Sequence, residues 1–140
     1  MKQSLMRTAP IFLGIAAIIA CGSDSTAPNA VVGSYAATQF TTTGSSGQTN
    51  QLLAGSTLNL TLASGGGLTG HLHLAATSAN PVFDADMAGT WTRIGNSVDF
   101  TQTAVDTFVE DITFNVEANG DLVGAGTFAG TAIALTLSRV

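Results

Sequence analysis

The chain has few of the side chains that catalysis, cross-linking or cofactor binding require. It contains a single cysteine, and charged residues make up only 9% of its 140 positions. One cysteine cannot form a disulfide within the chain, so hydrophobic burial must stabilise the fold. The sequence has no Cys-x-x-Cys pair, phosphate-binding glycine loop, Gly-x-Ser-x-Gly nucleophile motif or EF-hand acid ladder. We therefore predict no enzymatic activity, no catalytic residues and no cofactor.

Basic residues are also scarce, and half of them precede the single cysteine. Lys2 and Arg7 lie near the start, and only Arg93 and Arg139 follow Cys21. All nine acidic residues come after Cys21, so two bases against nine acids give that part a formal charge of −7. Phosphate backbones repel a chain this acidic. Nucleic acid is therefore excluded as a predicted partner.

Residues 1–20 have the organisation of a secretory signal peptide. A basic start precedes the apolar run 11–20, which is shorter than the ~20 residues that a membrane-spanning helix needs. The run closes as Ile18-Ile19-Ala20-Cys21, which resembles the lipobox of bacterial lipoproteins. That resemblance implies cleavage after Ala20 and attachment of a diacylglycerol lipid to Cys21, with a further acyl chain such as palmitate. The alternative is an ordinary signal peptide followed by a chance cysteine.

The lipobox resemblance also implies where the protein is located. A diacylated Cys21 supplies the two signals that stable membrane anchoring requires, so the membrane is a predicted partner. The domain would then face the periplasm or the outside of a bacterial cell. Gly22 follows the cysteine, instead of the aspartate that resembles an inner-membrane retention signal, and this favours the outer membrane. Residues 21–31 are predicted to be the lipidated cysteine and a flexible tether, because they are mostly small and polar.

Residues 32–140 predict one all-β domain. Aliphatic residues, threonine and glycine dominate this part, and eight segments alternate apolar and polar side chains between turn residues. Because side chains alternate faces along a strand, the loop lengths fix which residues oppose each other. A three-residue loop, 64–66, places Leu62 opposite Leu68. A two-residue turn at 95–96 places Trp91 opposite Phe100.

Eight consecutive antiparallel strands with one apolar face predict an up-and-down meander. Its first and last strands can pair, which favours a closed or nearly closed barrel over the alternative, a two-sheet β-sandwich. The sequence Gly33-Ser34-Tyr35 resembles the Gly-x-Trp with which lipocalin-like barrels begin, and Gly89-Thr90-Trp91 has the full pattern within the fourth segment. The resemblance implies a small apolar ligand inside the barrel.

Three glycines do not determine whether the barrel interior is filled or hollow. Gly70, Gly124 and Gly126 fall on inward-facing positions, where they either relieve crowding or leave a cavity. A cavity would fit an envelope protein that binds a small apolar ligand. A filled core would fit a structural envelope lipoprotein whose surface binds another protein. The pattern does not identify ligand-binding residues in either case.

A cluster of imidazoles and carboxylates provides a third hypothesis. The expected pairing of segments 68–74 and 82–93 places His71 opposite Asp86 and His73 opposite Asp84. Two imidazoles and two carboxylates on one surface are suitable ligands for zinc or a similar divalent cation. The alternative is a solvated ladder of cross-strand His–Asp pairs.

Overall fold

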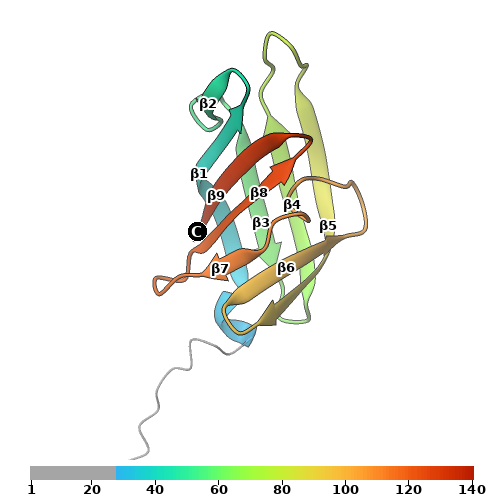
Figure 1. Ribbon diagram of the computed structural model, residues 1–140. Helices are drawn as coiled ribbons and strands as arrows, with labels where there is room; N and C mark the ends of the chain where they lie inside the picture. Colours follow the sequence, from blue (N-terminus) through green and yellow to red (C-terminus); the bar gives the residue numbers. More distant parts are fainter. Residues whose placement is uncertain (1–27) are drawn as a thin grey trace, which may run out of the picture.

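The structure, a computed structural model, describes residues 28–140. The predicted signal peptide and the predicted lipidation site, Cys21, lie outside this range. The described part is an all-β domain in which a short 3-10 helix precedes a single antiparallel sheet (Figure 1). The elements are η1 (Pro28–Val31), β1 (Gly33–Gly44), β2 (Gly47–Asn50), β3 (Thr57–Leu62), β4 (Gly67–Leu74), β5 (Phe83–Ile94), β6 (Ser97–Gln102), β7 (Phe114–Val116), β8 (Leu122–Phe128) and β9 (Thr131–Arg139).

Eight strands close into a barrel, and β2 is a short addition beside the second half of β1. Closure occurs at β1, which pairs with β3 along one edge and with β9 along the other. The remaining strands follow one another in chain order. The predicted eight-stranded meander is therefore confirmed in its closed form, and the two-sheet sandwich is not observed.

The first hairpin of the meander shows how loop length sets the register. The N–H of Ala63 donates to the carbonyl of Gly67 at 2.8 Å, which closes the three-residue loop between β3 and β4. Leu62 therefore pairs with Leu68, as predicted. Along β3 every second residue is a buried leucine and the residues between them are exposed. The apolar face of this hairpin thus lies inside the barrel.

Trp91 is the largest side chain in the core and is paired as expected. It lies opposite Phe100 across β5 and β6 and is only 6% exposed. Its indole N–H donates to the carbonyl of Ala63 at 2.9 Å, so the polar atom of this buried ring is satisfied. The turn that joins β5 to β6 has Gly95 at φ +61°, a left-handed conformation that glycine adopts without steric cost.

Strand β1 contains a bulge that alternation alone does not predict. Strict alternation would place Tyr35 and Phe40 on opposite faces, yet both are buried and 1% exposed. The pairing with β9 skips Thr38, because Ala37 and Gln39 pair with consecutive residues of β9. An extra residue on one strand reverses the alternation beyond it. Both aromatic side chains therefore contribute to the core.

Residues 28–31, which the sequence predicts to belong to the flexible tether, are part of the folded domain. Pro28–Val31 form η1, and Val31 is fully buried in the core. The hydroxyl of Tyr35 donates to the Val31 carbonyl at 2.9 Å, and the guanidinium of Arg139 donates to the Ala30 carbonyl at 2.6 Å. The same arginine lies over the Tyr35 ring at 5.6 Å. These contacts close the end of the barrel at which β1 begins.

The connection between β6 and β7 departs from the predicted pattern. The sequence suggests that Ile112 belongs to a strand with Phe114, but β7 contains only Phe114–Val116. Phe108 and Val109 are adjacent and both buried, which is not expected of a regular strand with one face toward solvent, because its neighbouring side chains point to opposite faces. Residues 107–112 instead form successive turns, and Phe108, Val109 and Ile112 belong to the hydrophobic core.

The inward-facing glycines are covered by neighbouring side chains. A Cβ atom added to Gly70 would lie 2.7 Å from Leu60 Cδ2, and one added to Gly124 would lie 2.9 Å from Phe114 Cδ1. Close packing of this kind is normal in protein interiors. The suggestion that these glycines leave a cavity is therefore wrong, and they relieve crowding. Residues 28–140 contain the whole closed sheet and its hydrophobic core.

Candidate functional site

A pocket of about 480 Å³ lies at one end of the barrel. It lies between the second half of β1, the β4–β5 loop and the β8–β9 turn. The chain enters the barrel at the other end, where η1 packs, and β1 runs from there to the pocket (Figure 1). The volume lies within the range of about 300–1,000 Å³ that is typical of small-molecule sites.

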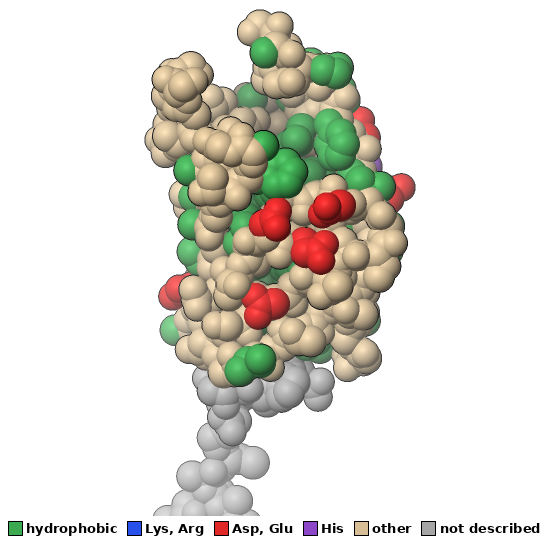
Figure 2. All heavy atoms as spheres, turned by 45° about the vertical axis from the view of Figure 1, so that its right-hand side comes forward, with side chains coloured by type: hydrophobic (Ala, Val, Ile, Leu, Met, Phe, Trp, Pro, Cys, Tyr) green, Lys and Arg blue, Asp and Glu red, His purple; other side chains and the backbone are tan. Residues whose placement is uncertain are grey.

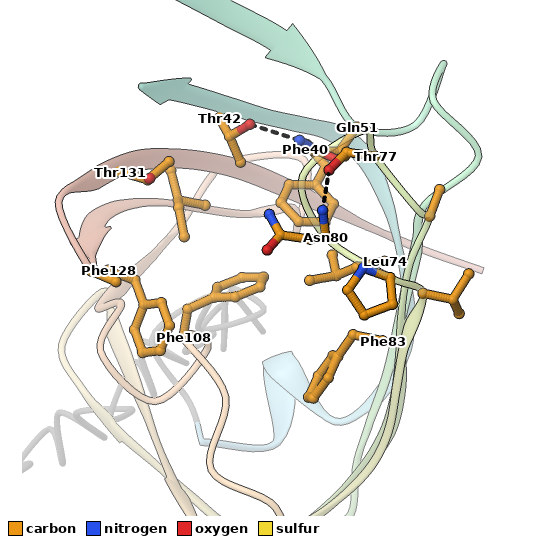
Figure 3. A pocket seen from close by; sticks show the side chains of 15 residues that line it. Phe40, Thr42, Gln51, Leu74, Thr77, Asn80, Phe83, Phe108, Phe128 and Thr131 are labelled. Atoms are coloured by element: carbon orange, nitrogen blue, oxygen red, sulfur yellow. Dashed lines mark hydrogen bonds between the residues drawn. The ribbon is translucent and has the colours of Figure 1, made fainter. Parts of the chain in front are cut away.

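The floor and walls of the pocket are apolar. Phe40, Phe108 and Ile133 lie at its base and are nearly buried, whereas Phe83 and Phe128 are 42% and 44% exposed. Figure 3 shows Phe83, Phe108 and Phe128 around the same space, although they come from β5, the β6–β7 connection and β8. Leu74, Pro81 and Val82 extend the apolar lining.

Three of the aromatic rings form a continuous series from the core to the solvent. The Phe40 and Phe108 ring centroids are 5.5 Å apart at an interplanar angle of 43°. The Phe108 and Phe128 centroids are 6.4 Å apart in an edge-to-face arrangement. Both distances lie in the range of favourable aromatic pairs. An apolar ligand in the pocket would therefore contact a surface that is continuous with the core.

Several polar groups of the lining bond to one another. The amide of Gln51 donates to the Thr42 hydroxyl at 2.7 Å, and the backbone N–H of Asn80 donates to the Thr77 hydroxyl at 3.0 Å (Figure 3). Thr77 also donates its backbone N–H to the Asn80 carbonyl at 2.8 Å. These bonds hold the β1–β3 connection and the β4–β5 loop in place. None of the residues that line the pocket carries a charge.

Phe108 reaches the pocket because a buried polar pair fixes the β6–β7 connection. The Thr107 backbone N–H donates to Gln102 Oε1 at 2.8 Å, and Gln102 Nε2 donates to the Thr107 hydroxyl at 2.9 Å. Thr107 is 3% exposed, so these bonds satisfy groups that water does not reach. They set the position from which Phe108 points toward the pocket.

The His–Asp cluster forms on the outer face of β4 and β5 with the predicted register. His71 pairs with Asp86 and His73 pairs with Asp84. Nδ1 of His71 lies 2.8 Å from Asp86 Oδ1, and Nδ1 of His73 lies 2.6 Å from Asp84 Oδ1. Within residues 28–140, no group of three or more His, Cys, Asp or Glu side chains is arranged to hold a metal ion. Zinc binding at this cluster stays a prediction.

The same cluster shifts two protonation equilibria. The hydrogen bond with Asp86, aided by the charges of Asp86 and Asp84, raises the pKa of His71 above its ordinary value of 6.5. The hydrogen bond with His73 lowers the pKa of Asp84 below its ordinary value of 3.8. Both shifts favour the charged forms, as expected of an opposite-charge pair. The arrangement has the geometry of a solvated cross-strand ladder.

The pocket itself is not evident from the sequence. Alternation indicates that Phe83 faces inward, but it places Phe108 in no strand and says nothing of where loops meet at the end of the barrel. The strongest signal is the run Phe108-Val109, because two adjacent apolar residues after a polar stretch indicate a segment that leaves the strand pattern. That signal indicates burial and does not indicate a cavity.

Comparison with known proteins does not place the chain in a family: no family model, no curated protein and no solved structure matches it. The architecture is nevertheless consistent with the lipocalin-like barrels that the first strand resembles, because both are closed antiparallel barrels of eight strands. In the part of the chain that the structure describes, no helix is long and apolar enough to cross a membrane.

Proposed function

We propose that this protein is a lipid-anchored binding protein of the bacterial cell envelope that holds a small apolar ligand in the pocket at the end of the barrel. The observation that carries the proposal is an apolar pocket of about 480 Å³ with half-exposed phenylalanines at its mouth. Exposed aromatic surface costs about 25 cal/mol per Å² relative to burial. A ligand that covers Phe83 and Phe128 would recover part of this free energy.

The described part of the chain begins at the end of the barrel opposite the pocket. Lipidation of Cys21 would tether the end that η1 closes, because the chain enters the barrel there. β1 has 12 residues, which correspond to roughly 30 Å along the barrel axis for about 3.3 Å per residue and a tilt of about 40°. The mouth would then face away from the anchoring membrane, into the periplasm or the outside. A ligand would reach it from that aqueous side, and outer-membrane anchoring remains the favoured arrangement.

The proposal can be tested by fluorescence titration with the neutral probe N-phenyl-1-naphthylamine. The protein for this experiment is the chain from Gly22 onward, which contains the whole described barrel and lacks the predicted lipidation site. We expect saturable binding in the micromolar range, since a probe of this size gains about 0.3–0.5 kcal/mol per heavy atom at most. Phe83→Asp should weaken binding at least tenfold, because it places a charge in the apolar wall.

A matched control separates the pocket from general surface hydrophobicity. Ile94 is 78% exposed at the opposite end of the barrel, so Ile94→Asp adds the same charge without touching the pocket. Its titration should match that of the unmodified chain. Binding that does not saturate, or that both variants weaken equally, would remove the pocket as the site. Thermal unfolding of each variant verifies that the barrel is intact.

A structural envelope lipoprotein with a protein-binding surface is the second candidate. The tight packing around Gly70 and Gly124 supports it, because the barrel below the pocket is filled by its own side chains. Absence of saturable probe binding would favour this role. The third candidate, a surface site for a divalent metal at His71, His73, Asp84 and Asp86, is tested by calorimetric zinc titration. Heat of binding that is lost in His71→Ala would support it.

A further inference from the structure

The β6–β7 connection places its carboxylates on the outside while its apolar residues line or support the pocket. Phe108, Val109 and Ile112 are buried, whereas Asp106 and Asp111 are exposed. Glu110, which is partly exposed, lies two residues from the pocket residue Phe108. Figure 2 shows acidic side chains gathered directly beside an exposed apolar area on this face. The mouth of the pocket is therefore bordered by negative charge.

No arginine or lysine side chain of the described residues balances this charge at the mouth. Beyond its two histidines, the described part of the chain has only two basic residues, Arg93 and Arg139. The guanidinium of Arg93 donates to the Gly95 carbonyl at 2.7 Å, next to the β5–β6 turn, and Arg139 holds Ala30 of η1. Both lie toward the end of the barrel that η1 closes. The pocket lining contains no arginine, lysine or histidine that could pair with an anionic ligand.

We infer that the pocket selects apolar ligands without negative charge and rejects anionic amphiphiles such as fatty acids. This inference rests on the proposed function, because it assumes that the pocket binds a ligand. An anionic headgroup at the mouth would lose hydration without gaining a partner. It would also be repelled by Asp106, Glu110 and Asp111. At separations on the order of 10 Å in water, each carboxylate would weaken binding of an anion about twofold at low salt, and screening would reduce this effect at physiological ionic strength.

Two probes that share one skeleton test this inference. N-phenyl-1-naphthylamine is neutral, and 1-anilinonaphthalene-8-sulfonate is the same molecule with a sulfonate group. On the chain from Gly22 onward, we expect the sulfonate to bind at least tenfold more weakly at low salt. Added salt should reduce the difference in affinity between the two probes, because screening weakens the repulsion of the sulfonate. The neutral probe should show no such dependence.

Removing the carboxylate charges of the β6–β7 connection should raise the affinity for the sulfonate probe and leave the affinity for the neutral probe unchanged. In the variant Asp106→Asn/Glu110→Gln/Asp111→Asn, the sulfonate should bind roughly three to ten times more tightly at low salt, and the neutral probe should stay within about twofold. The control Glu117→Gln/Asp121→Asn removes charge from the β7–β8 turn, at the opposite end of the barrel. It should alter neither affinity.

The outcomes separate the two proposals. Equal binding of both probes to the unmodified chain, or equal changes of both affinities in the triple variant, would overturn the charge selection and leave the proposed function intact. Failure of both probes to saturate would overturn the proposed function itself. Thermal unfolding of the triple variant shows whether the connection remains folded, and a loosened connection would weaken binding of the neutral probe.

Discussion

Gln102 and Thr107 bind each other through two hydrogen bonds that fold the β6–β7 connection back onto the barrel. One bond, at 2.8 Å, uses the Thr107 backbone N–H, and the other, at 2.9 Å, uses its hydroxyl. Thr107 also lies 3.6 Å from the sulfur of Met87. The pair thus joins the last residue of β6, the connection and the barrel interior. It determines where Phe108 lies and hence the shape of the pocket.

We predict that Gln102→Ala lowers the free energy of unfolding by about 1–3 kcal/mol. The substitution leaves the buried Thr107 N–H without its partner, and an unsatisfied buried group costs that much. Urea denaturation measures the change. Gln39→Ala serves as control, because Gln39 is exposed and its amide oxygen accepts a hydrogen bond from the Thr136 hydroxyl at the surface. An equal effect of both substitutions would contradict the role of the pair.

Gly124→Ala should destabilise the barrel by about 1–3 kcal/mol, the range typical of overpacked cores. The new methyl would meet the side chains of Ile112 and Phe114, whose nearest atoms lie under 3.0 Å from it. A double-mutant cycle with Ile112→Ala tests the cause, because the cost should shrink once the opposing side chain is shortened. Gly65→Ala, which meets no atom within 4 Å, should be nearly neutral. Additive effects in the cycle would show that Ile112 is not the obstacle.

Ala129→Asn should stabilise the protein by about 0.5–1 kcal/mol. Ala129 has φ +47° and Gly130 has φ +79° in the two-residue turn between β8 and β9. Alanine is strained in this left-handed conformation, whereas Asn-Gly is the preferred pair of such hairpin turns. A rise in the melting temperature would confirm the strain. Ala118→Asn should give no comparable rise, because Ala118 lies in the β7–β8 turn and does not have a positive φ.

The His–Asp ladder should stabilise the fold most strongly in weakly acidic solution. The contribution of His71, whose pKa is raised, is complete below 6.5 and is lost as the pH rises through the folded value. The contribution of Asp84, whose pKa is lowered, is complete above 3.8 and is lost as the pH falls through the folded value. Both contributions are therefore present between 3.8 and 6.5.

Melting temperatures of the unmodified chain and of His71→Gln measure this dependence. The difference between the two should be larger at about pH 5 than at about pH 8, because the imidazole is charged only at the lower pH. Thr101→Ala, which changes an exposed residue of β6 that does not titrate, should give the same difference at both values. A larger His71→Gln effect at the higher pH would contradict the predicted sign.

The registers could be predicted from the sequence because loop length and alternation constrain each other. These two constraints together predict that Leu62 lies opposite Leu68, Trp91 opposite Phe100 and His71 opposite Asp86. Prediction failed where other interactions override alternation. The bulge at Thr38 adds one residue to β1, and the turns over residues 107–112 remove Ile112 from the strand that its spacing from Phe114 suggests.

The pocket could not be predicted for a related reason. It depends on where the β4–β5 loop, the β6–β7 connection and the β8–β9 turn meet, and no local pattern encodes distances between loops that are far apart in the chain. The His–Asp cluster, by contrast, is a matter of register alone and was predictable. The identity of Cys21 as a lipidation site stays a prediction from its motif.

Pairing of the first and last strands has a consequence for folding. β1 finds one of its two neighbours only in β9, so a chain that is synthesised from its N-terminus cannot close the barrel until β9 has been made. Until then the edges of β1 and β8 are open to pairing with other chains. Loss of β9 would leave both edges open permanently.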